Sequence, residues 1–247
     1  ATSPNLSTSE FSACIPVADS NAAGGALSFD GIDDFVVIAH GASLSLQTFT
    51  LEAWANIEDP LAARAVLLSK GANFGNYTLA VRGSEAVNAR DVEYVHQTAA
   101  GNFSCCGLEP GPLAFGEWVH LAVTFGDGTA RVYVNGGLIA TEFEAPPPVE
   151  NDLTLFFGRL LDENPQHMRG VLDEVRIWNV VRSEAEVAAN YNRTIEPGTP
   201  GLAGYWKFDE EGGTAVVDSS GSGNHGLLGN GDTGMPARVV STAPIVQ

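Results

Sequence analysis

Recurrence of an apolar residue at every second position is the feature that most constrains the fold of this chain. In residues 49–57 every second side chain is apolar, and the pattern returns in residues 118–125. A period of two gives a β-strand one apolar face and one polar face. The apolar members are Phe49, Leu51, Ala53, Ala55 and Ile57 in the first segment and Val119, Leu121, Val123 and Phe125 in the second. Two such segments predict a sheet that covers a core on one side.

Turn signals between further apolar runs predict many short strands. Asn135-Gly136 separates two apolar runs within residues 131–140, and Asn-Gly supplies the positive φ angles of a tight hairpin turn. Further strands are expected at residues 153–157 and 171–178. The chain contains 28 Gly and 13 Pro, as frequent turns require. These signals together predict an all-β fold.

One short helix and a closing tail are expected beside the strands. Ser183 and Glu186 form an S-x-x-E capping box, which predicts the start of a helix. The segment 201–247 has too few apolar residues to build its own core, so we expect it to dock on the preceding sheets. Residues 1–25 are small and polar and are expected to form an N-terminal arm. The predicted organisation is therefore this arm followed by a single domain, 26–247, which the tail closes.

The charge of the chain restricts its partners. Thirty acidic residues against twelve basic ones give a formal net charge of −18. A field of this sign repels phosphate backbones, so no nucleic acid is expected as a partner. The chain has no apolar run of about 18 residues, so no membrane span is predicted. The excess carboxylates either serve solubility in an extracellular setting or include ligands for divalent cations, and both can hold together.

Five segments, taken in order, resemble the laminin-G-like family of domains. They are Ala26–Val36, Phe49–Trp54, Gly116–Phe125, Val132–Gly136 and Gly170–Trp178. The resemblance implies a concanavalin A-like jelly roll, a sandwich of two antiparallel sheets. It also implies a secreted sugar-binding, adhesion or accessory domain, with a glycan or an extracellular protein as partner and neighbouring domains in a larger chain. Such a resemblance defines the fold more closely than the function.

The tail resembles a known part of the family in an unusual place. Residues 204–226 are similar to the segment that usually opens such a domain, but here they follow the last sheet motif. Either a second repeat is truncated, or this segment closes the sheet of the first domain. The shortage of apolar residues in the tail favours closure.

The acidic turn at residues 30–34 is the best-supported metal site. It carries three carboxylates and a glycine whose carbonyl oxygen can approach a cation. Calcium takes about six to eight oxygen ligands in flexible geometry, which such a turn can supply in part. The family resemblance adds to this interpretation, because related sandwiches often carry structural calcium near the chain start and a late-strand Asp. We therefore expect calcium as the cofactor, with the ligands Asp30, Gly31, Asp33 and Asp173.

Asp173 joins this set because of its position in a strand. In residues 171–177 alternation places its carboxylate on the same face as the apolar side chains. If that face is the core side, the buried charge needs an arginine, several backbone N–H donors or a metal. The alternative is that Asp30 and Asp173 cap turns or pair with Arg176 and Arg169.

No catalytic site is expected. Glycoside hydrolysis needs two carboxylates that face one cleft, and hydrolases of this fold carry a Glu/Asp/Glu strand motif that is absent here. Asp173 and Glu174 are adjacent, so alternation turns them to opposite faces. A glycoside hydrolase is therefore the most distant alternative. The favoured function is a calcium-stabilised carbohydrate-binding or adhesion module. A structural or protein-binding spacer is the nearer alternative.

The irregular stretch 83–115 is the predicted ligand surface. Sugars need a flat aromatic side chain for stacking and planar polar groups for their hydroxyls. Alternation places Tyr94 and His96 on one strand face with Val92. Tyr94 is either such a platform or half-buried filler of a sheet. The predicted ligand-binding residues are Arg90, Tyr94, His96 and Asn102.

The three cysteines Cys14, Cys105 and Cys106 leave one thiol unpaired. We favour a disulfide between Cys14 and one member of the adjacent pair. The alternative is a disulfide within the pair that leaves Cys14 free.

Overall fold

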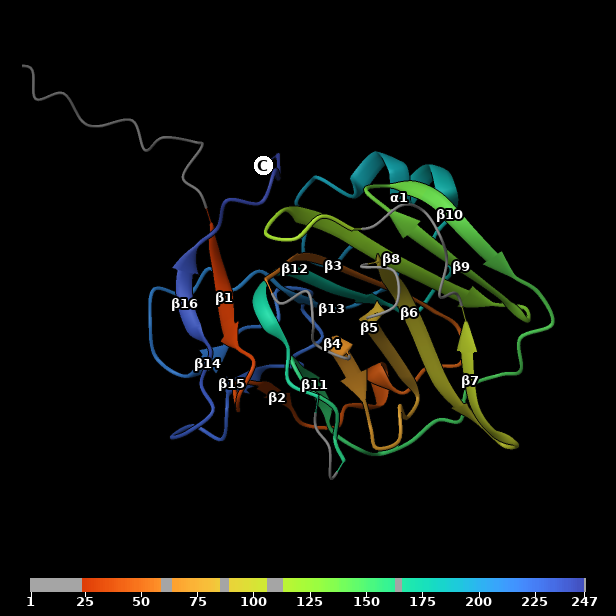
Figure 1. Ribbon diagram of the computed structural model, residues 1–247, viewed down its shortest axis with the longest axis horizontal. Coiled ribbons are helices and arrows are strands. Elements are labelled where there is room, and N and C mark those ends of the chain that lie inside the picture. The colour runs from red at the N-terminus through yellow and green to blue at the C-terminus, as the bar shows by residue number, and fades with distance from the viewer. Residues whose placement is uncertain (1–23, 59–63, 85–88, 106–112, 163–165, 247) are drawn as a thin grey trace, which may run out of the picture.

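The computed structural model describes residues 24–58, 64–84, 89–105, 113–162 and 166–246, except for the side chains of residues 83–84, 89–90 and 104–105. These residues form two antiparallel sheets that pack face to face around a large apolar core (Figure 1). In spatial order, sheet A contains β10 (Gly137–Glu142), β9 (Thr129–Val134), β8 (Trp118–Gly126), β3 (Phe49–Ile57), β12 (Arg169–Trp178), β1 (Gly25–Asp30) and β16 (Ala237–Val240), and β13 (Leu202–Trp206) also pairs with β12. Sheet B contains β14 (Ala215–Val216), β15 (Gly226–Leu228), β2 (Val36–Ile38), β11 (Leu155–Phe157), β4 (Arg64–Lys70), β5 (Tyr77–Ser84), β6 (Ala89–Thr98) and β7 (Gly101–Cys105). The arrangement confirms the predicted sandwich.

The two alternating segments form the centre of sheet A. They become β3 and β8, which pair antiparallel along their whole length from Phe49 opposite Phe125 to Asn56 opposite Trp118. All the apolar members predicted for these segments lie in the main core. The period-two pattern therefore gave both the strands and the face that each buries.

The predicted hairpin turn is confirmed between β9 and β10. Asn135 has a φ of 48° and Gly136 a φ of 78°, as the predicted turn requires at both central positions. A Cβ at Gly136 would also lie 2.7 Å from the side chain of Tyr191. The glycine thus serves both the turn and the close approach of the segment after α1 (Glu184–Asn190).

The predicted helix is confirmed as α1, and its capping box is complete. The Ser183 hydroxyl accepts a hydrogen bond from the Glu186 backbone N–H (3.3 Å), and the Glu186 carboxylate accepts one from the Ser183 N–H (2.8 Å). Val187 packs on Ala122 and Tyr133. Because these two residues belong to β8 and β9, α1 covers part of the outer face of sheet A (Figure 1). No described helix is long and apolar enough to cross a membrane.

The tail contributes strands to both sheets. β13 pairs with the second half of β12, β15 pairs with β2, and β16 pairs with β1. Asp218, in the loop after β14, accepts backbone hydrogen bonds from Tyr205 (3.0 Å), Ser220 (2.9 Å) and Asn224 (2.8 Å). One buried carboxylate therefore ties this loop to β13. Such pairings are what a sheet-closing role for residues 201–247 requires.

β12 contains a β-bulge that the strand pattern did not reveal. Asp173 pairs with Trp54 and Arg176 with Glu52, so three steps along β12 match two steps along β3. Glu174, inside this irregularity, has a φ of 50°. An extra residue of this kind changes which face the following side chains take.

The bulge overturns the expected orientation of Asp173. The core contains Leu172, Val175 and Ile177 but not Val171. Asp173 lies opposite Trp54 on the outer face of sheet A, so it does not share a face with Val175 and Ile177. It is nevertheless buried, because the tail covers that part of the outer face.

Candidate functional site

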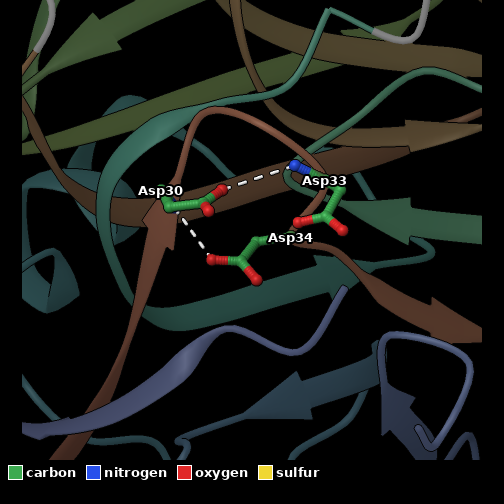
Figure 2. A group of neighbouring side chains, drawn as sticks. All are labelled: Asp30, Asp33 and Asp34. Atoms are coloured by element: carbon green, nitrogen blue, oxygen red, sulfur yellow. Dashed lines mark hydrogen bonds between the residues drawn. The ribbon is translucent and has the colours of Figure 1, made fainter. Parts of the chain in front are cut away.

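The acidic turn after β1 brings three carboxylates together. Asp30 is the last residue of β1, and Asp33 and Asp34 follow before β2 begins. One oxygen from each carboxylate lies within 4.8 Å of the others. Figure 2 shows the three side chains gathered on this single turn.

Local hydrogen bonds define the shape of the turn. One oxygen of Asp30 accepts from the backbone N–H groups of Ile32 (2.8 Å) and Asp33 (3.4 Å), and one oxygen of Asp34 accepts from the Asp30 N–H (2.9 Å). Gly31 has a φ of 80°, a conformation that favours glycine, and a Cβ there would lie 2.9 Å from the Cβ of Arg169. The backbone thus fixes the carboxylates of Asp30 and Asp34 without using all their oxygens.

The three carboxylates repel one another. Burial raises the pKa of Asp34, and the negative charges of Asp30 and Asp33 raise it further, while the hydrogen bond from the Asp30 N–H opposes both effects. A cation placed among the three groups would reverse the repulsion.

The donor set fits calcium. Two oxygens that bind the same calcium ion at about 2.3–2.6 Å lie no more than about 5 Å apart, and the three carboxylates meet this condition. The remaining ligands would have to be carbonyl oxygens or water. The turn therefore meets the distance condition for a site for a hard divalent cation between β1 and β2.

Asp173 does not belong to this group. Along the pairing of β1 with β12, Asp30 lies opposite Arg169, whereas Leu27 lies opposite Leu172, next to Asp173. The Asp173 carboxylate accepts hydrogen bonds from the Glu174 N–H (2.7 Å) and the Ser241 hydroxyl (2.5 Å). The structure thus separates the metal ligands predicted together: Asp30, Gly31 and Asp33 share the turn, and Asp173 lies elsewhere.

Asp173 lies where β1, at the start of the described region, meets the tail, residues 201–247. β1 and β13 share one edge of β12, on either side of the bulge. The Gly25 N–H donates to Asp209 (2.7 Å), and the Ser241 N–H donates to the Gly24 carbonyl (2.8 Å). Burial raises the pKa of Asp173 to about 8, since the Ser241 hydrogen bond only partly offsets it and the Glu174 and Asp209 charges add to it.

Two of the predicted ligand residues are buried in the core. Tyr94 is 0% exposed and packs against Phe49 and Phe125. His96 is also buried, and its Nε2 lies 2.8 Å from the Pro146 carbonyl oxygen. The alternation correctly put both on one face with Val92, but that face is the core side. Neither side chain offers a surface on which a sugar could stack, which corrects the prediction.

The other predicted ligand and disulfide residues are described less completely. Asn102 is exposed on β7, opposite Gln97 of β6. Arg90 belongs to β6 and Cys105 to β7, but their side chains lie outside the described part of the structure. Cys14 and Cys106 lie outside the described residues altogether.

A buried ionic network on the outer face of sheet A was missed. Glu52 lies 3.1 Å from Arg182, 3.4 Å from Arg176 and 3.3 Å from His120, and Arg176 also contacts Glu174 at 2.6 Å. Burial would raise the pKa of Glu52, but the close contact with His120 and the two arginine charges lower it to about 2. The network fastens the segment after β12 to sheet A. The sequence signal that could have revealed this network is the presence of charged residues at the polar positions of strands that are otherwise apolar.

Comparison with known families accounts for this architecture. Residues 30–188 match the family model described as the concanavalin A-like lectin/glucanases superfamily. The chain belongs to this superfamily. The match begins at the acidic turn and ends within α1, so the resemblance seen in the sequence is confirmed across both sheets.

Related sequences and structures extend the comparison. Pappalysin-1 of Mus musculus is 23% identical over 184 residues, which are 67% of this chain and 11% of that protein. The human protein is 30% identical over 81 residues, 30% of this chain and 5% of its own length. This superfamily member therefore spans about a tenth or less of the curated relatives that it matches.

Solved structures share the fold at low identity. A protein from Bacteroides ovatus named as carbohydrate-binding has a TM-score of 0.69 and 21% identity, with 91% of this chain and 62% of that chain covered. A heptameric SAP-like pentraxin from Limulus polyphemus has a TM-score of 0.58 and 15% identity over 85% and 96%. Domain 4 of the extracellular arabinanase AbnA from Geobacillus stearothermophilus, solved with arabinotriose, has a TM-score of 0.52 and 18% identity over 66% and 75%.

Proposed function

We propose that this chain is a non-catalytic carbohydrate-recognition module of a longer extracellular protein, stabilised by calcium at the acidic turn. The match of residues 30–188 to a superfamily of lectins and glucanases is the observation that carries the proposal. The fold shared with a protein named as carbohydrate-binding and with a domain solved with arabinotriose supports the choice of ligand class. The partial coverage of much longer relatives supports a module within a larger chain.

Calcium has a structural role in this proposal. Asp30, Asp33 and Asp34 would bind the ion, which would neutralise their mutual repulsion and hold the start of β2 to the end of β1. The neighbouring tail loop would be ordered with them, because Phe35 donates its N–H to the Gly234 carbonyl (3.0 Å).

Thermal melting with calcium and with chelator tests the metal site. Binding to the native state raises stability by mass action, so free calcium about 100-fold above Kd should raise Tm by roughly 5–10 °C. Asp33→Asn should remove most of this rise, because its exposed carboxylate has a predicted role only in binding the ion. Asp127→Asn, an exposed acid in the turn after β8, is the control and should keep it. An identical midpoint with calcium and with chelator would refute the calcium proposal.

Glycan binding is tested with an array of plant, microbial and animal oligosaccharides probed in calcium and in chelator. We expect binding to at least one glycan in calcium. A release assay on the same polysaccharides should yield no reducing ends. Failure to bind any glycan in calcium would favour the spacer function instead, and catalytic release of sugar would contradict the non-catalytic assignment.

A further inference from the structure

Two hollows lie side by side on the rim of the sandwich, along the segment that joins β10 to β11. One has a volume of about 290 Å³ and is lined by His40, Ser45, Asn151 and Asp152 among others. The second, of about 360 Å³, is lined chiefly by Ala99, Ala100 and the tract 146–148. Glu150 lines both hollows. Each is close to the lower limit of small-ligand sites, which span about 300–1,000 Å³, and together they fall within that range.

Hydrogen bonds, most of them partly buried, hold the floor of the polar hollow in place. The Asn151 N–H and the Ser45 hydroxyl lie 3.1 Å apart, and the same hydroxyl lies 3.1 Å from the Asn151 carbonyl oxygen. The Asn151 side chain accepts from the Leu153 N–H (3.0 Å) and donates to the Lys70 carbonyl (3.3 Å). Asn151 therefore has little freedom to move when a ligand arrives.

A buried ammonium group lies behind this floor. Lys70 Nζ donates to the Asn151 side-chain oxygen (3.1 Å) and carbonyl (3.3 Å) and to the Leu153 carbonyl, and it lies 3.3 Å from His40 Nδ1. His40 Nε2 in turn lies 3.5 Å from the Asp152 carboxylate. The Lys70 side chain thus contacts both His40 and Asn151, two of the residues that line the polar hollow.

The proline tract is fixed from the core side. His96 Nε2 contacts the Pro146 carbonyl, the Val149 N–H donates to the Gln97 carbonyl (2.8 Å), and the Asn76 side-chain amide donates to the Val149 carbonyl (3.2 Å). Proline restricts the backbone further, since its ring fixes φ. A wall that is ordered before binding loses little entropy on binding.

The two hollows offer complementary chemistry. Glu150 and Asp152 are exposed carboxylates that accept hydrogen bonds, and the wall of Pro146, Pro147 and Ala100 is apolar. A sugar ring has a hydroxyl edge that donates hydrogen bonds and a C–H face that packs on apolar surface. The carboxylates and the net charge of −18 repel uronic, sialylated and sulfated sugars.

We infer that an uncharged oligosaccharide binds across Glu150, with one sugar ring on the proline tract and the hydroxyls of the next on Glu150 and Asp152. This inference rests on the proposed carbohydrate-recognition function and specifies its site and the class of its ligand. This site replaces the ligand surface predicted at Tyr94 and His96. In the new site, His96 positions the proline tract from the core side.

The test uses the full chain in calcium against two panels of immobilised oligosaccharides. One panel is neutral (gluco-, manno-, xylo- and arabino-oligosaccharides) and the other is acidic (oligogalacturonate, alginate and heparan sulfate fragments). We expect binding to the neutral panel alone. Binding restricted to the acidic panel would overturn the inference while leaving carbohydrate recognition intact, and binding to neither would overturn both.

Two variants place the site. Glu150→Gln combined with Asp152→Asn should weaken binding to the best neutral ligand about tenfold, as expected for the loss of hydrogen bonds to charged acceptors. Ala100→Glu introduces a charge into the apolar hollow and should weaken it at least as much. Glu211→Gln, an exposed acid in the tail, is the control. Unchanged thermal midpoints would show that the variants fold, and unchanged affinity in both would place the glycan elsewhere on the domain and overturn this site.

Discussion

At the scale of single residues, two buried carboxylates of sheet A have pKa values that are shifted in opposite directions. Glu52 lies among Arg176, Arg182 and His120 and keeps its charge, with a pKa of about 2. Asp173 has one hydroxyl and one backbone N–H as hydrogen-bond donors, and its pKa rises to about 8. The difference lies in the arginines, because a buried charge without a counter-ion is costly.

The raised pKa of Asp173 predicts a pH dependence of stability. The unfolded carboxyl has a pKa of about 4, so the folded state holds the extra proton between that value and about 8. The contribution of this group is therefore complete below about pH 4 and is lost as pH rises towards 8. Asp173→Asn should raise the free energy of unfolding at pH 8.5 in chelator by at least about 1 kcal/mol, the value of one pKa unit.

Urea unfolding at pH 5 and at pH 8.5 measures this effect. At pH 5 the gain in stability from the substitution should be clearly smaller than at pH 8.5, because the folded parent then buries a neutral carboxyl and the pH lies only about one unit above the unfolded pKa. Asp127→Asn is again the exposed control. Equal destabilisation of Asp173→Asn at both pH values would mean that the carboxylate is ionised in the fold, and the pH prediction would then be wrong.

At the level of single residues, the sequence predicted which side chains share a face of a strand. It did not predict which of the two faces points to the core. Alternation placed Tyr94 with His96, and the structure agrees, yet either face of β6 could have been the solvent side. The choice depends on sheet A packing against sheet B, which no local pattern contains. The acidic turn was easier to find, since Asp30, Asp33 and Asp34 are close in sequence and the turn brings them together.

At the scale of elements, signals contained within one element predicted well. The capping box of α1 is such a signal, since Ser183 and Glu186 satisfy each other's backbone donors. The bulge in β12 is the opposite case. It is visible only in the register against β3, where Asp173 and Arg176 face residues two positions apart. The predicted orientation of Asp173 failed for that reason.

The cap also supplies a prediction at this scale. Ser183→Ala removes the hydroxyl that accepts from the Glu186 N–H and should lower the free energy of unfolding by about 1 kcal/mol. Ser183→Asp retains an acceptor and should restore most of the loss. Chemical denaturation measures both variants, and equal stability of Ser183→Ala and the parent would show that tertiary packing of Val187 alone holds α1 in place.

At the scale of the whole molecule, the tail completes both sheets rather than adding a separate layer. It supplies β13 and β16 to sheet A and β14 and β15 to sheet B. The sequence indicated this role through a shortage of apolar residues, but it could not name the partner strands. Those depend on distant pairings such as Leu27 with Arg238.

Truncation after Pro200 tests the proposed single domain. The shortened chain would expose one edge of β12, the outer edge of β1 and part of the core around Trp206, so we expect it to be insoluble or unfolded by circular dichroism. Addition of the fragment 201–247 in trans should recover folded protein. A truncated chain that melts cooperatively at the parent temperature would contradict the single-domain proposal.

The meeting of β1 with β16 also bears on the connectivity of the fold. The Ser241 N–H reaches the Gly24 carbonyl, so residues 24 and 241, near the two ends of the described region, are adjacent, while the bond between Pro200 and Gly201 lies in a surface turn before β13. A linker from residue 246 to residue 24 and new termini at Gly201 would retain every strand pairing described above. Such a circular permutant would carry the segment 204–226 at its start, the position that its resemblance to a domain-opening segment implies.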